Sequence, residues 1–304
     1  MKYIDLQING CFGIDFNSDE LTIDDMAKAC SQLQDDGIEL ILATLITDDV
    51  LSMVSRIRRL AAWCQREQDI RRVIGGIHVE GPFISSLPGF VGAHPVDCVR
   101  PASIEAARVL VEAGEGLVRL VTLAPEQDPQ CEVIHWLTRQ GIIVAAGHTD
   151  ASIDQLRRAC DAGLTLFTHL GNGCPRMIDR HDNIIQHVLT LTDRLTVTLI
   201  ADGFHVPWFF VANVLKMFGS ERTVLVSDAT AAAGQGPGVY RLGRQSIEST
   251  GNGATYSLEH PGYLGGSATL LRPAIARLGA ELALDEETIA KLVFHNPRRL
   301  LPST

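Results

Sequence analysis

The sequence predicts an α/β fold, the (β/α)₈ TIM-like barrel, in which eight parallel strands alternate with helices. Three observations support this prediction. The chain has 304 residues, a length that such a barrel often uses as one domain. Short aliphatic runs alternate with longer amphipathic stretches, and most of these runs are followed by His, Asp or Glu. We therefore expect one barrel domain over residues 1–304.

Eight runs rich in aliphatic and β-branched residues predict the strands. Parallel strands that are covered on both faces are near-continuous hydrophobic runs, and these runs have that character. They occupy residues 3–7, 38–45, 73–78, 118–123, 142–146, 165–168, 196–201 and 223–227.

Amphipathic stretches between the runs predict the helices. Several begin with residues that favour helix starts, such as Thr22 followed by Asp24 and Asp25, and Ser103 shortly after Pro101. The predicted helices occupy residues 23–34, 50–65, 103–113, 131–140, 153–162, 184–191, 208–218, 270–278 and 286–292. A Gly-rich segment at about 236–266 interrupts the alternation, and we expect a hairpin-like excursion there.

Composition limits the partners. Lys and Arg total 26 against 36 Asp and Glu, a net charge of −10 with no dense basic stretch, which argues against nucleic-acid binding. No apolar run approaches the ~18 residues of a membrane span, and Asp5 and Gln7 interrupt the start where a signal peptide would be apolar. Seven cysteines without a CxxC pair favour a reducing compartment. We expect a cytoplasmic protein with a small-molecule partner, no nucleic acid and no membrane.

Polar residues that follow the predicted strands indicate a metal site. Glu80, His148 and His169 follow the third, fifth and sixth strands, and Asp228 follows the eighth. The carboxyl ends of barrel strands meet at one face, so these residues converge there. Two imidazoles and a carboxylate suit Zn²⁺, with Fe²⁺, Co²⁺ or Mn²⁺ as alternatives, and Asp228 is placed to accept the proton of water. Each residue alone could instead cap a helix, but four at four strand ends favour a metal site.

Six motifs in order give the sequence a family resemblance: HVEGPF, GHTDA, THLGNG, ADGFH, SDAT and GYLGGS. In this order and spacing they resemble the N-acetylglucosamine-6-phosphate deacetylases of the amidohydrolase superfamily. The resemblance runs from residue 5 to residue 300. It implies a metal-dependent hydrolase barrel that hydrolyses the C2 acetamide to give glucosamine 6-phosphate and acetate.

The resemblance also implies residue roles. Glu80, His148 and His169 become the metal ligands, and Asp228 becomes the general base and acid. His94, in the GAH after HVEGPF, matches the histidine near the scissile carbonyl, and His205 matches one that binds the sugar.

Phosphate recognition is implied in the same way. The backbone N–H groups around Asn172 and Gly173, together with Arg180, match the phosphate-binding positions of the family, where the arginine can be offered across a homodimer interface. The alternative interpretation of Arg180 is a solvent-exposed charge on a loop, with no part in phosphate binding.

The sequence also departs from its relatives. Gln7 and Asn9 stand where many amidohydrolases have His-x-His for a second metal, so we expect one metal per chain. Gly171, Gly173 and Cys174 differ from the usual family residues, and the usual β-sandwich segments are not evident, which suggests a short form. Two other functions therefore stay open: an amidohydrolase for another N-acyl amino sugar or a cyclic amide, and a non-catalytic sugar-phosphate-binding barrel.

Overall fold

The computed structural model describes residues 1–301 and contains the predicted barrel; residues 302–304 of the expected domain lie outside this part. Eight parallel strands follow one another in chain order around the sheet. The first and last are joined by a parallel bridge between Ile8 and Ala229, and the N–H of Asp228 donates to the carbonyl of Gln7 at 2.9 Å. The strands are β1 (Tyr3–Ile8), β4 (Ile38–Ile46), β5 (Ile74–Glu80), β6 (Val118–Leu123), β7 (Ile143–Ala146), β8 (Leu166–Phe167), β9 (Thr196–Ile200) and β10 (Thr223–Val226).

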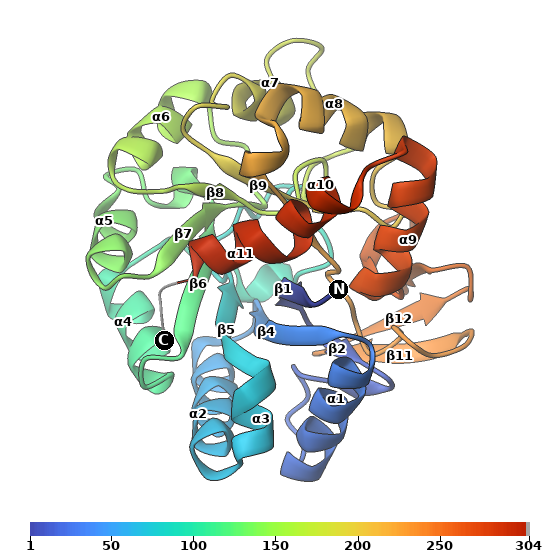
Figure 1. Ribbon diagram of the computed structural model, residues 1–304. Helices are drawn as coiled ribbons and strands as arrows, with labels where there is room; N and C mark the ends of the chain where they lie inside the picture. Colours follow the sequence, from blue (N-terminus) through green and yellow to red (C-terminus); the bar gives the residue numbers. More distant parts are fainter. Residues whose placement is uncertain (302–304) are drawn as a thin grey trace.

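Helices surround this sheet (Figure 1). The expected helix starts at Thr22 and Ser103 are confirmed, since both side chains accept a hydrogen bond from the third residue of the helix. The helices are α1 (Ile23–Asp35), α2 (Val50–Arg66), α3 (Gln68–Val73), α4 (Ile104–Ala113), α5 (Glu132–Arg139), α6 (Ile153–Asp161), α7 (Ile184–Leu189), α8 (Trp208–Phe218), α9 (Leu271–Leu282), α10 (Glu286–Ala290) and α11 (Asn296–Leu300).

Two local expectations differ from the structure. The third strand begins at Ile74 rather than at residue 73, because the six-residue helix α3 ends at Val73 and is too short to give a helical period. The helix expected at 286–292 is α10, which continues through a π-helical turn (Lys291–His295) into α11. Figure 1 shows α11 crossing in front of the strands.

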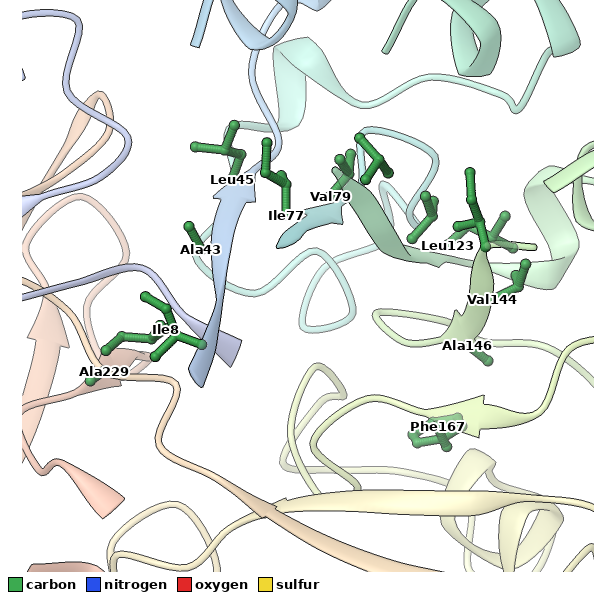
Figure 2. Packing of buried hydrophobic residues seen from close by; sticks show 14 of the residues in the cluster. Ile8, Ala43, Leu45, Ile77, Val79, Leu123, Val144, Ala146, Phe167 and Ala229 are labelled. Atoms are coloured by element: carbon green, nitrogen blue, oxygen red, sulfur yellow. The ribbon is translucent and has the colours of Figure 1, made fainter. Parts of the chain in front are cut away.

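The core has two layers, because neighbouring residues of a strand face opposite sides of the sheet. One cluster fills the barrel, and Phe294, Leu300 and Leu301 pack against it. It contains Ile4, Leu6, Leu42, Leu120, Ala145, Leu166, Ile200, Val224 and Val226. The larger cluster lies between sheet and helices. Figure 2 shows part of it on the strands and at the bridge residue Ala229: Ile8, Ala43, Leu45, Ile77, Val79, Leu123, Val144, Ala146, Phe167 and Ala229.

Two small sheets add to the barrel. The segment after β10 forms a four-stranded antiparallel sheet, and its Ser267 bridges to Ala229 at the barrel end. This sheet contains β11 (Gly238–Leu242), β12 (Gln245–Ser249), β13 (Ala254–Ser257) and β14 (Leu264–Ser267), and Figure 1 shows β11 and β12 at its right side. The short pair β2 (Gly10–Cys11) and β3 (Ile14–Asp15) follows β1 and was not expected from the sequence.

Candidate active site

A cavity of about 420 Å³ lies at the carboxyl ends of the barrel strands. Glu80 is the last residue of β5, and His148, His169 and Asp228 come shortly after β7, β8 and β10. Glu80, His148 and His169 are buried, Asp228 is half-buried, and all four line this cavity. The strand ends therefore bring together residues that are up to 148 positions apart in the sequence.

Backbone strain marks three of these positions. His148, His169 and Asp228 have φ angles of 50°, 33° and 49°. Residues other than glycine rarely adopt such angles, which cost energy and are kept where the surrounding structure uses them. The strain is consistent with backbones that are held to aim these side chains into the cavity.

Glu80, His148 and His169 could hold a metal ion, because their ligand atoms all lie within 4.8 Å of one another. Nε2 of His169 lies 3.0 Å from Oε1 of Glu80, and Nε2 of His148 lies 3.5 Å from the same oxygen. Burial opposes the charge of Glu80, but its hydrogen bonds with both imidazoles hold its pKa well below the usual range. The set offers two nitrogen donors and one oxygen donor to a single point.

The loop after β5 fixes the orientation of His148. Nδ1 of His148 lies 2.8 Å from the carbonyl oxygen of Phe90 and must donate to it, since a carbonyl only accepts. Nε2 is then left as the metal-binding atom. Gly92 and Gly173 lie against the same ring, and a Cβ on either would come within 3.1 Å of it.

Asp228 is held by two amides that the sequence analysis considered only as missing metal ligands. Nδ2 of Asn9 donates to Oδ1 of Asp228 at 2.7 Å, and Nε2 of Gln7 lies 3.2 Å from the same oxygen. Gln7 also reaches Oε1 of Glu80 at 3.1 Å. Burial, followed by the charge of Glu80, raises the pKa of Asp228 to about 6.

His94 lies beside the metal-binding group. Its Nε2 is 3.3 Å from Nε2 of His148, and the residue is buried in the cavity wall. Burial and the neighbouring His148 lower the pKa of His94 to about 3. A neutral imidazole is therefore available next to the ligands.

His205 also lines the cavity and is oriented by Asp202. Nδ1 of His205 lies 2.8 Å from Oδ2 of Asp202, which leaves Nε2 free of that contact. Asp202 accepts a further hydrogen bond from Ser267 of β14 at 2.8 Å. Asp202 was missed by the sequence analysis, although it stands in the ADGFH motif.

The residues assigned to phosphate binding separate into two groups. Asn172 and Gly173 line the cavity, whereas Arg180 is exposed and is not among the described residues that line it. Arg176 is exposed as well, but it lies in the cavity wall. The space beside Gly171 is taken by Phe210, because a Cβ on this glycine would lie 3.1 Å from the Phe210 ring.

A buried polar chain inside the barrel was also missed. His78, two residues before Glu80 on β5, contacts Thr122 through Nε2 at 2.8 Å, and Thr122 contacts Thr168 at 2.8 Å. Burial lowers the pKa of His78 to about 4, so it is neutral near pH 7. The only available sequence signal was a His inside a strand that is otherwise apolar.

Together these groups can hold a metal ion, transfer a proton and form hydrogen bonds with a polar ligand. Glu80, His148 and His169 supply the donors for a divalent metal ion. Asp228 is a half-buried carboxylate that can take up and return a proton. His94 and His205 provide polar contacts in the same cavity.

Comparisons with known proteins agree with this geometry. The chain is 34% identical to N-acetylglucosamine-6-phosphate deacetylase of Bacillus subtilis over 257 residues, which are 84% of the chain and 63% of that protein. It is 31% identical to N-acetylgalactosamine-6-phosphate deacetylase of Escherichia coli O157:H7, over 82% of the chain and 64% of that protein. The chain thus spans less than two thirds of the length of these curated relatives.

A solved structure extends the comparison. The structure of a variant N-acetyl-D-glucosamine-6-phosphate deacetylase from Mycobacterium smegmatis, in complex with N-acetyl-D-glucosamine-6-phosphate, superposes with a TM-score of 0.88 at 32% identity. The alignment covers 99% of this chain and 77% of that one. No family model matches the chain. In residues 1–301 no helix is long and apolar enough to cross a membrane.

Proposed function

The chain belongs to the N-acetylglucosamine-6-phosphate deacetylase family of the amidohydrolase superfamily, and from this premise we propose that it hydrolyses the acetamide of N-acetylglucosamine 6-phosphate. The products are glucosamine 6-phosphate and acetate. The observation that carries the proposal is the convergence of Glu80, His148 and His169 with Asp228 in one cavity.

The donor set fits one divalent metal ion. It offers two imidazole nitrogens and a carboxylate oxygen, and the contact between His148 and the Phe90 carbonyl leaves Nε2 of His148 free to bind. This chemistry is typical of Zn²⁺ in catalytic sites, so we assign Zn²⁺, with Fe²⁺, Co²⁺ or Mn²⁺ as alternatives. Gln7 and Asn9 donate to carboxylates here, which supports a single ion.

A bound ion would polarise the amide carbonyl and increase the acidity of water. Asp228 accepts the proton of the attacking water and later delivers it to the leaving amine. With a pKa of about 6 it is ionised at neutral pH and is a stronger base than an ordinary aspartate. Asn9 and Gln7 hold its Oδ1 in place during both transfers.

The remaining residues bind the substrate. His94 donates to the acetamide carbonyl, and His205, oriented by Asp202, hydrogen-bonds the sugar. The backbone at Asn172 and Gly173 faces the phosphate. Arg180 is exposed and does not line the cavity of its own chain, so we propose that it contacts the phosphate bound by a second copy and that the protein is a homodimer.

The location follows from the cysteines. All seven are free, which suits a reducing compartment, and we place the enzyme in the cytoplasm.

A second candidate substrate is N-acetylgalactosamine 6-phosphate, because the Escherichia coli relative at 31% identity carries that name. The test is free-amine release by the metal-loaded protein from N-acetylglucosamine, N-acetylgalactosamine and both 6-phosphates. We expect the highest kcat/KM for N-acetylglucosamine 6-phosphate. Preference for the galactose isomer would select the second candidate, and no release from any of the four sugars would contradict the proposal.

A further inference from the structure

Apart from the catalytic cluster and His205, one cationic side chain lines the cavity. Arg176 is the only arginine among the described residues of the wall, and none of them is a lysine. The whole chain carries a net charge of −10, so an anionic ligand must be held by a local cation. Glu80 and Asp228, the carboxylates of the wall, belong to the catalytic cluster.

The guanidinium of Arg176 has N–H groups that are available to a ligand. Its Nη2 donates to the carbonyl oxygen of Gly262 at 2.8 Å, and within residues 1–301 it forms no ion pair with a carboxylate. Arg244, by contrast, lies within 3.6 Å of three carboxylates. A guanidinium has five N–H groups in a planar fork, so most of those of Arg176 remain available to an anion.

The loop that carries Arg176 is fixed against the catalytic residues. A Cβ on Gly173 would lie 3.0 Å from Nδ1 of His148, and one on Gly89 would lie 2.7 Å from Cα of Pro175. Arg176 follows Pro175 directly, and Gly262, its partner, lies between β13 and β14. The exposed side chain therefore connects the barrel loop to the loop between β13 and β14 at the cavity wall.

We propose that Arg176 binds the phosphate of the substrate from within the same chain and makes the enzyme prefer phosphorylated over neutral N-acetylated sugars. This inference rests on the proposed function and assigns a residue to that site. It differs from the role of Arg180, which needs a second copy of the chain. Each subunit then holds one anion-binding arginine of its own.

The test compares Arg176→Gln, Arg176→Lys and the control Arg157→Gln in the full-length, metal-loaded protein. Arg157 is an exposed arginine on α6 that pairs with Asp154, away from the cavity. Deacetylation of N-acetylglucosamine 6-phosphate and of N-acetylglucosamine is measured as kcat/KM. Binding of glucosamine 6-phosphate and of glucosamine is measured by calorimetry, which does not depend on turnover.

We expect Arg176→Gln to lower kcat/KM for the phosphorylated sugar by roughly 10- to 100-fold and to leave the neutral sugar within about twofold. Arg176→Lys keeps the positive charge but lacks the planar, bidentate donor group, so it should lower kcat/KM for the phosphorylated sugar less than Arg176→Gln does. Calorimetry shows the same weakening for glucosamine 6-phosphate, while Arg157→Gln matches the wild type in every assay.

Two results would overturn the inference: equal losses on both sugars, or full affinity of Arg176→Gln for glucosamine 6-phosphate. Failure of the proposed function looks different. In that case the wild type hydrolyses neither sugar, while the Arg176-dependent binding of glucosamine 6-phosphate can still be measured.

Discussion

Replacement of Asp228 by Asn separates its chemical role from its structural role. The amide is the same size and keeps an oxygen that can accept from Nδ2 of Asn9 and Nε2 of Gln7, which contact Oδ1 in the wild type. An amide cannot accept the proton of water at neutral pH. We therefore expect Asp228→Asn to lower kcat by on the order of 10²-fold or more, with metal content unchanged.

The same substitution has a predictable effect on stability. Burial raises the pKa of Asp228 from 3.8 to about 6 in the folded protein. Folding thus favours the protonated acid, and stability is lost as the pH rises from about 4 to about 6. Above pH 6 the buried charge costs up to about 3 kcal/mol, a cost that Asn does not carry. The metal-free variant is expected to be at least as stable as the wild type at pH 8.

Three measurements check this prediction: free-amine release, metal content per chain and thermal unfolding of the metal-free proteins at pH 5 and pH 8. The variant should gain stability relative to the wild type between these two pH values. A kcat within about tenfold of the wild type would remove Asp228 as the proton acceptor. Loss of metal from the variant would make Asp228 a ligand instead.

Two further predictions concern residues around the site. Burial raises the pKa of Asp5 from 3.8 to about 7, so the folded state favours the protonated carboxyl group, and this contribution to stability is lost as the pH rises through that range. Asp5→Asn should therefore become more stable relative to the wild type between pH 4 and pH 8 in denaturant titrations. A difference in unfolding free energy that stays constant with pH would refute this. Gly92 has a φ of 61° and lies against His148, so an added Cβ would strain the backbone and crowd the imidazole ring. Gly92→Ala should therefore weaken metal binding at least tenfold in a competition titration with a chelator. Unchanged affinity would contradict this prediction, because it would mean that the loop moves without displacing His148.

The strand ends were predictable because short aliphatic runs mark the strands and amphipathic stretches mark the helices between them. Aliphatic runs of strand length place Glu80, His148, His169 and Asp228 at one barrel face, whatever the lengths of the helices between them. The motif order then supports their roles. The fold follows from the same pattern, since alternating strands and helices have few ways to bury both faces of a parallel sheet.

Other features depend on contacts that a sequence does not display. Gln7 and Asn9 form hydrogen bonds with Asp228 in a region where the pairing of β1 with β4 is irregular, between Asp5 and Ile8. An irregularity of this kind changes which side chains face the barrel mouth. Short elements such as α3 carry too few residues for a period.

The two arginines of the loop after β8 illustrate the same limit. Arg176 and Arg180 are four positions apart and both lie outside any helix or strand. Both are exposed, and only the path of the loop places Arg176 in the cavity wall and Arg180 outside it. A sequence motif alone could not separate them.

The central claim, a single metal ion held by Glu80, His148 and His169, is tested most directly by titrating metal-free protein with Zn²⁺ while following free-amine release from N-acetylglucosamine 6-phosphate. The claim predicts no activity at the start, then a linear rise that ends at about one ion per chain. His169→Gln should remove this rise, because it deletes one of the three donors. Full activity of the metal-free protein, or a rise that ends only at two ions per chain, would contradict the claim.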